Sequence, residues 1–152
     1  MNNKIFVTRA DFQFDLQRFT ELALQQDESG NYLIGTTDDM NTLADYVNAS
    51  NNCAGLIFKQ TEDIDLSAIE NFTPIGDYTN YSSFDGTFDG CGHTISNLKI
   101  NSSSEWGGLF GYVSGGTIQN VNLINATVQN NYSGNDRTYT DALVGFLSGL
   151  RQ

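Results

Sequence analysis

A short pattern that occurs twice constrains the fold of this chain more than any other feature. The pattern reads Thr-Ile-x-Asn-apolar-x-apolar, and its two copies begin at Thr94 and Thr117, 23 positions apart. Repeats with a period of about 20–50 residues are the signature of solenoids, in which each unit stacks on the next. Apolar residues alternate within each copy, as in a strand with one buried face. The repeat therefore predicts one strand of this kind per coil, with Asn97 stacked on Asn120 in an amide ladder.

The composition favours an all-β fold and excludes two classes of partner. The chain has 152 residues, with 18 Asp and Glu against 7 Lys and Arg, so its net charge is −11. Nucleic acids and anionic membranes are bound through a basic face, and neither is expected as a partner. The sequence has no apolar run of about 18 residues, so no membrane insertion is expected. The 15 glycines suit tight turns, and the length fits one domain with a sizeable core.

Two segments are expected to make up the chain. Residues 1–27 lack the apolar core of a secretory signal and are predicted to be a leader or docking segment. Residues 28–152 are predicted to form the β-solenoid. We expect this solenoid to be a truncated part of a longer repeat array, or to have its last coil covered by a partner.

A short helix is predicted near the start of the solenoid. Thr37 would be its N-cap, because a hydroxyl followed by Asp38 and Asp39 favours a helix N-terminus. The helix is expected over 38–49, where Met40, Leu43, Ala44 and Val47 fall on one face. This helix is predicted to cover the open first coil, whose backbone edge would otherwise be exposed.

The remaining apolar segments are interpreted as strands. Long strands are predicted at 56–66, 93–100 and 117–128, where apolar and polar residues alternate. The segment 142–149 repeats the pattern of 108–115 at an interval of 34 positions and predicts a further coil. The aromatic side chains of Phe84, Phe88, Phe110 and Tyr112 are expected to fill the wider end of the coil.

Four motifs together resemble a known repeat family. They are FTPIG at 72–76, GTFDGCGHTISNL at 86–98, GLFGY at 108–112 and GTIQNVNL at 116–123. This set resembles the GLUG-motif repeats of bacterial surface proteins, over roughly residues 33–149. The resemblance implies a right-handed parallel β-helix in a secreted or surface-anchored, adhesin-like protein. In immunoglobulin-cleaving proteases that carry such repeats, the repeats are an accessory region, so the resemblance implies no catalytic residue here.

The acidic residues do not predict a catalytic site. Asp85 and Asp89 would lie about 13 Å apart on an extended strand, given the rise of ~3.3 Å per residue. Glycosidase carboxylates are separated by roughly 5–9.5 Å. Asp63 and Asp65 are interpreted in the same way, as turn or surface residues. With His93 as the single histidine, neither a metal site nor a serine triad is predicted, and no cofactor is expected.

The two cysteines leave an alternative open. Cys53 and Cys91 would form a disulfide between neighbouring coils in an oxidising compartment. Two free thiols are the other interpretation.

Aromatic residues in polar loops are the candidates for binding. They are Trp106, Tyr132, Tyr139 and Tyr81. Such side chains stack on sugars or anchor protein partners. The alternative is burial against the wall of the solenoid, and it is the favoured interpretation for Trp106.

The function predicted from sequence is a non-enzymatic β-solenoid module of a bacterial cell-surface or secreted protein. It would act in adhesion or as a stiff presenting stalk, with a host glycan, a matrix protein or neighbouring repeats as partner. Two alternatives are a carbohydrate-active β-helix enzyme with an exposed acid cluster, and a structural spacer or repeat fragment without a function of its own.

Overall fold

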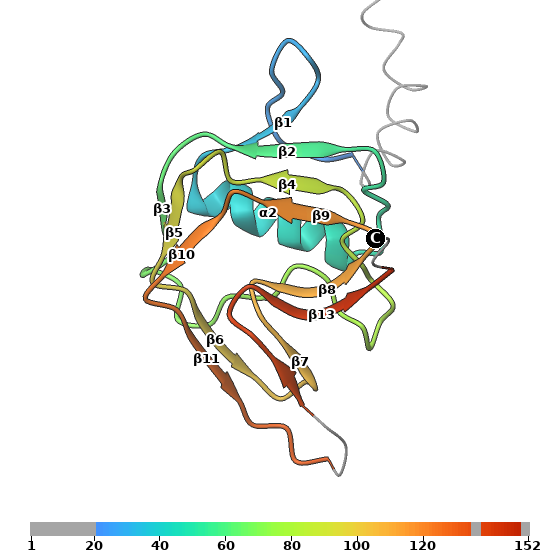
Figure 1. Ribbon diagram of the computed structural model, residues 1–152, viewed down its shortest axis with the longest axis vertical. Helices are drawn as coiled ribbons and strands as arrows, with labels where there is room; N and C mark the ends of the chain where they lie inside the picture. The colour runs from blue at the N-terminus through green and yellow to red at the C-terminus, as the bar shows by residue number, and fades with distance from the viewer. Residues whose placement is uncertain (1–20, 135–137, 150–152) are drawn as a thin grey trace, which may run out of the picture.

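The computed structural model of the protein describes residues 21–134 and 138–149. These residues form short strands and one α-helix, as Figure 1 shows. Every pair of named strands runs parallel. The strands are β1 (Tyr32–Ile34), β2 (Ile57–Gln60), β3 (Ile64–Asp65), β4 (Thr87–Asp89), β5 (Thr94–Ser96), β6 (Lys99–Ser102), β7 (Trp106–Gly107), β8 (Phe110–Ser114), β9 (Thr117–Gln119), β10 (Asn122–Ile124), β11 (Thr127–Asn130), β12 (Tyr139–Thr140) and β13 (Val144–Ser148).

The chain passes three times along the same path (Figure 1). We call these passes coil 1 (57–84), coil 2 (87–114) and coil 3 (117–148). Five small sheets join the coils, with the strand orders β1-β2-β4-β9, β3-β5-β10, β6-β11, β7-β12 and β8-β13. Several small parallel sheets that connect successive coils are consistent with the predicted β-solenoid.

The register between coils differs from the predicted interval of 23 residues. Thr94 pairs with Asn122, 28 positions later, and Thr117 pairs with Thr87, 30 positions earlier. The two copies of the repeated pattern therefore lie on different sides of the coil. The interval of 34 was correct, since Val144 of β13 pairs with Phe110 of β8.

Left-handed asparagines explain why the pattern recurs at an interval shorter than one coil. Asn97, Asn120 and Asn125 have φ values of 59°, 55° and 52°. Asparagine tolerates this conformation better than most residues, so it lets the strand bend at a corner. The predicted long strands are consequently divided at these corners. The segment 117–128, for example, contains β9, β10 and the start of β11.

Amide ladders join the corners of successive coils, although not with the predicted partners. The Asn97 amide nitrogen donates to Asp65 Oδ1 at 2.8 Å, and the Asn125 amide nitrogen donates to Asn97 Oδ1. The prediction of Asn120 above Asn97 was wrong, because Asn120 instead donates to Asp89 Oδ1 at 3.0 Å. These bonds stabilise the corners from outside the core.

Inside the coils, apolar side chains stack in columns. Phe58, Phe88 and Ile118 form one column, in register between β2, β4 and β9. The aromatic rings also touch across columns, with the Phe84 and Phe110 centroids 5.1 Å apart. Phe84, Phe88 and Phe110 are fully buried, as predicted. Tyr112 was predicted to join them but is half-buried and packs against other rings, described below.

The helix α2 (Thr37–Asn48) lies across coil 1. Its N-cap is Thr36 rather than the predicted Thr37, because the Thr36 hydroxyl accepts from the Asp39 amide while the Asp39 carboxylate accepts from the Thr36 amide. The predicted apolar face is confirmed, since Met40, Leu43, Ala44 and Val47 are buried. At its ends, Thr37 Oγ1 donates to the Asp65 carbonyl and Asn48 Nδ2 to the Pro74 carbonyl. The helix thus closes this end of the coils, as predicted.

The first described residues also contact the core. Leu22 is 7 % exposed and belongs to the core cluster. The Leu33 amide of β1 donates to the Gln25 carbonyl at 2.8 Å. Residues 1–20 of the predicted leader lie outside the described residues. Among the residues the structure describes, no helix has the length and apolar character needed to cross a bilayer.

Candidate binding surface

Six aromatic residues form a cluster on one flank of the coils. Tyr78 is at its centre, with ring centroids 4.9 Å from Trp106, 5.1 Å from Tyr112 and 5.1 Å from Phe146. Tyr81 and Tyr139 lie at its margins, in contact with Tyr78 and Trp106 respectively. We call this group the flank aromatic cluster: Tyr78, Tyr81, Trp106, Tyr112, Tyr139 and Phe146.

Stacking of coil 3 on coil 2 positions four of these rings. Trp106 of β7 pairs with Tyr139 of β12, and their rings stack with centroids 4.7 Å apart and an angle of 13°. Tyr112 of β8 pairs with Phe146 of β13, with centroids 5.6 Å apart. In-register parallel strands place side chains of successive coils above each other, which aligns the rings.

A tight loop of coil 1 supplies the remaining two rings. The Asp77 and Ser82 backbones pair as an antiparallel bridge, and the Asp77 carboxylate accepts from the Thr79 amide and the Asn80 side chain. Tyr81 adopts a left-handed φ of 57°. This closed loop projects Tyr78 onto the cluster and leaves Tyr81 at the surface.

Three of the four candidates predicted from sequence, Tyr81, Trp106 and Tyr139, belong to this cluster. Tyr81 is 80 % exposed and Tyr139 is 41 % exposed, whereas Trp106 is only 9 % exposed. Trp106 thus lies largely within the cluster, which agrees with the alternative interpretation that its side chain is buried. The Tyr132 hydroxyl donates a hydrogen bond to Glu105 Oε1 at 2.6 Å. Glu105 immediately precedes Trp106 in the sequence. Sequence reasoning did not assign Tyr112 and Phe146 to this site, although their interval of 34 residues was the signal for their pairing.

A groove opens beside the cluster. Its volume is about 300 Å³, and it lies between the loop of coil 1 and the 102–106 segment of coil 2. The groove is lined by Asn48, Thr73, Pro74, Gly76, Asp77, Asn80, Ser102, Ser104 and Trp106. Hydroxyl, amide and carboxylate groups next to exposed aromatic rings are suited to binding a polar ligand with an apolar face.

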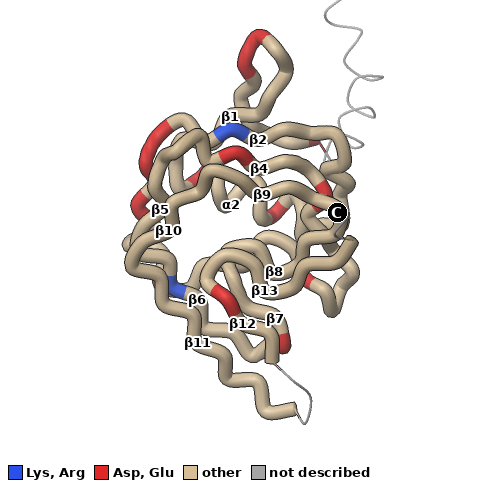
Figure 2. The backbone as a smooth tube through the Cα atoms, viewed as in Figure 1, with Lys and Arg blue, Asp and Glu red and all other residues tan. Residues whose placement is uncertain are grey.

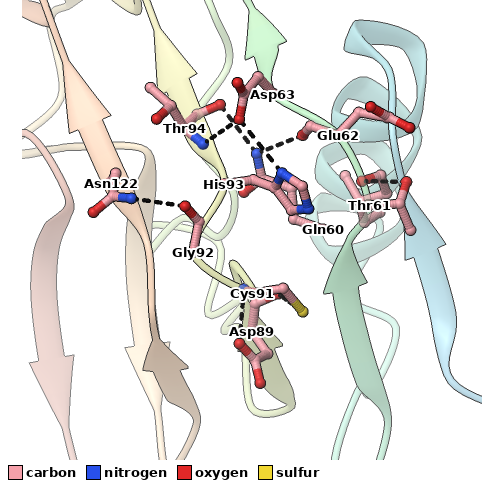
Figure 3. A network of polar contacts seen from close by, with 11 residues as sticks. Gln60, Thr61, Glu62, Asp63, Asp89, Cys91, Gly92, His93, Thr94 and Asn122 are labelled. Carbon is pink, nitrogen blue, oxygen red and sulfur yellow. Dashed lines mark hydrogen bonds and ion pairs between the residues drawn. The ribbon is translucent and has the colours of Figure 1, made fainter.

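The acidic residues form hydrogen bonds at separate corners of the coils and do not gather in one site. Figure 3 shows Asp63 accepting from the Thr94 amide at 2.9 Å, with His93 Nδ1 3.4 Å from the same carboxylate oxygen. The Asp85 carboxylate accepts from the Cys53 amide at 2.7 Å. Hydrogen bonds from Asn120, the Cys91 amide and Gln119 lower the pKa of Asp89 to about 2. These carboxylates hold turns and adjacent coils.

The potential metal ligands and the two cysteines are dispersed over the described part of the chain. It contains no group of three or more His, Cys, Asp or Glu side chains placed to hold a metal ion. Cys53 is buried and Cys91 is exposed, and both thiols are free. This arrangement corresponds to the interpretation of two free thiols. Burial, with the nearby Asp85 charge, raises the pKa of Cys53 to about 12.

Together, these features define a mostly β protein whose stacked parallel strands are consistent with a β-solenoid and present an aromatic flank. The chain is similar to halomucin of Haloquadratum walsbyi, with 39 % identity over 129 residues. The match covers 78 % of this chain and 1 % of the relative, so this chain corresponds to a very small part of that protein. No family model matches the chain, and the resemblance to GLUG-motif repeats therefore rests on the motifs alone. No solved structure matches it.

Proposed function

We propose that this chain is a non-enzymatic module of a cell-surface or secreted protein and that it presents the flank aromatic cluster to a partner. The module would be a right-handed, GLUG-type parallel β-helix serving in adhesion or as a stiff stalk. Similarity to halomucin supports a place outside the cell or at its surface, because that name denotes a mucin-like protein.

The observation that carries the proposal is the exposure of aromatic rings next to a groove that contains hydrogen-bonding side chains. Tyr81 and Tyr139 are 80 % and 41 % exposed, although both contact other rings of the cluster. Large exposed aromatic groups on a rigid support are typical anchors of binding surfaces. Asp77, Asn80 and Ser104 provide the neighbouring groove with hydrogen-bonding groups. This combination fits a glycan, whose sugar rings have one apolar face and a rim of hydroxyls.

The stacked coils support the stalk role. Parallel hydrogen bonds connect each coil to the next, and the amide ladders add bonds at the corners. The acidic residues at these corners are separately engaged in turns and ladders, which supports a module without catalysis.

A glycan-array and matrix-protein binding screen on the full chain tests this function. The informative variant combines Tyr81→Asn with Tyr139→Ser, because asparagine tolerates the left-handed φ of residue 81 and both rings are exposed. Loss of a specific signal at least tenfold, with an unchanged circular dichroism spectrum, is expected. Ile124→Ala is the control, since Ile124 is 54 % exposed on β10, outside the cluster.

Three outcomes would contradict the proposal. Absence of any specific binding by the folded protein would favour a structural spacer. Equal loss of binding in the Ile124→Ala control would show that the flank aromatic cluster is not the specific binding surface. The appearance of new reducing ends during incubation with a bound glycan would show hydrolysis and overturn the non-enzymatic assignment.

A further inference from the structure

The groove beside the flank aromatic cluster exists because coil 1 takes a shorter path than coil 2. The Phe72 amide donates to the Lys99 carbonyl, and the Ile75 amide donates to the Leu109 carbonyl, both at 2.8 Å. Between these two contacts coil 1 runs only from residue 72 to 75, whereas coil 2 runs from 99 to 109. The additional length of coil 2 forms β6 and β7, which project from the coils together with β11 (Figure 1). Coil 1 therefore leaves one side of this projection uncovered.

This position makes the groove independent of any contact on coil 3. Among the described residues, its lining comes from coil 1, coil 2 and the end of α2, and none of it from coil 3. Asn48 of α2 fixes one wall, because its side chain donates to the Pro74 carbonyl and accepts from the Gly76 amide, both at 2.9 Å. The groove is thus a built feature between two stacked coils.

The groove offers a carboxylate that only accepts hydrogen bonds and two hydroxyls that can donate them. Asp77 Oδ1 accepts from the Thr79 amide and Asp77 Oδ2 from the Asn80 side chain, each at 2.9 Å. Each carboxylate oxygen has two lone pairs, so both can still accept from a ligand. The Ser102 and Ser104 hydroxyls accept from backbone amides at 2.9 and 3.4 Å, and their own protons remain for donation. A sugar hydroxyl both donates and accepts, so it suits both kinds of group.

Asp77 also gives the groove a negative charge. Lys59 and Lys99 are the cations of the described part of the chain, and neither lines the groove. Figure 2 shows these two positions in blue, on β2 and at the start of β6. Lys99 precedes Ser102 by about 10 Å along the strand, roughly one Debye length at physiological salt. Residues 135–137, outside the described residues, contain one acid and one base and add no net charge. On a chain of net charge −11, an anionic ligand is therefore repelled at this groove.

We propose that the groove selects uncharged sugars and that Asp77 is the residue that determines this specificity, an inference that rests on the function proposed above. An uncharged sugar donates a hydroxyl to the Asp77 carboxylate. A sugar acid or a sulfated sugar brings a second anion to the same place, and an ionised acidic group has no proton to donate. Like charges that face each other in a binding site reject the wrong ligand. The aromatic rings bind the apolar face of either sugar, so the charge decides between them.

Pairs of glycans that differ only in an acidic group test this selectivity on the full chain. The array holds neutral oligosaccharides that end in galactose or glucose, each beside its sialylated, glucuronylated or sulfated counterpart. The wild type is expected to bind a neutral member at least tenfold more tightly than its acidic counterpart in about 50 mM NaCl. The preference should narrow in about 500 mM NaCl, because salt screens the repulsion.

Two isosteric variants locate the effect. Asp77→Asn removes the charge and keeps an oxygen that can accept from the Thr79 amide. It should reduce the preference for the neutral member at least fivefold, mainly through tighter binding of the acidic one. Asp65→Asn is the matched control: Asp65 likewise accepts from an amide two residues later, Ser67, and from an asparagine side chain, Asn97, but it does not line the groove. This control removes the same charge from the chain and should leave the preference unchanged.

The outcomes separate this selectivity from the proposed function. If the folded wild type bound neither member of any pair, both would be overturned. Binding of acidic members as tightly as neutral ones would overturn the selectivity alone and leave glycan binding in place. Equal shifts in Asp77→Asn and Asp65→Asn would overturn the role of Asp77. The salt response of the wild type decides if Asp77→Asn does not fold, since a preference that is identical at both salt concentrations would refute an electrostatic origin.

Discussion

Substitution of Asn97 separates the two roles that a corner asparagine has in this fold. Asn97 holds a left-handed φ of 59°, and its side chain bonds Asp65 of coil 1 and Asn125 of coil 3. Asn97→Gly removes the ladder bonds but accepts the backbone conformation. Asn97→Ala removes the same bonds and retains the steric cost of a Cβ in the left-handed region.

The structure sets the size of both effects. Two exposed hydrogen bonds contribute at most about 0.5 kcal/mol each, at the low end of the usual range, so Asn97→Gly should lower the free energy of unfolding by up to about 1 kcal/mol. The left-handed conformation costs an ordinary L-residue roughly 1–2 kcal/mol. Asn97→Ala should therefore lower the free energy of unfolding by about 1–3 kcal/mol, and the alanine variant should be the less stable one.

Urea unfolding followed by circular dichroism, at one fixed protein concentration, measures these differences. Lys99 supplies the control, because it is exposed on β6 and is not among the residues with positive φ. There the order should reverse, with Lys99→Ala more stable than Lys99→Gly by about 0.4–1 kcal/mol. An Asn97→Ala variant as stable as Asn97→Gly would refute the assignment of a strained corner.

Three further outcomes follow from individual side chains. Phe110→Ala should lower the free energy of unfolding by about 3–5 kcal/mol in calorimetry, since the ring is fully buried between Phe84 and Phe88; a change below about 1 kcal/mol would contradict the stacked core. Because the folded-state pKa of Asp89 is lowered to about 2, its stabilising contribution is present above about pH 4 and is lost as the pH falls towards 2. The stability advantage of the wild type over Asp89→Asn should shrink over that range in acid titrations, and a constant difference would exclude this role. In native protein a thiol reagent should modify Cys91 rapidly and Cys53 only on unfolding; equal rates would contradict the burial of Cys53.

The aromatic site shows how far sequence reasoning reached towards function. Loop position singled out Tyr81, Trp106 and Tyr139 one by one as binding candidates, and the structure joins their rings through Tyr78 and Trp106. Their assembly depends on three coils, because Tyr81 belongs to coil 1, Trp106 to coil 2 and Tyr139 to coil 3. No local pattern contains such contacts. The burial of Trp106 agrees with the interpretation favoured for it from sequence, but the rings that cover it come from other coils and could not be named from its loop.

By itself, the sequence determined the local elements and the class of the fold. The buried face of α2 follows from its apolar spacing, and the alternating strands and corner asparagines follow from residue-level conformational preferences. Only the tertiary structure decided which corner stacks on which. The same pattern of a short strand followed by asparagine occurs at consecutive corners. The sequence alone therefore could not distinguish the interval of 23 residues between two such corners from the true interval of 28–30 residues between stacked strands. Register is fixed by the burial of entire columns such as Phe58, Phe88 and Ile118, and burial summed over several coils is a property of the assembled core.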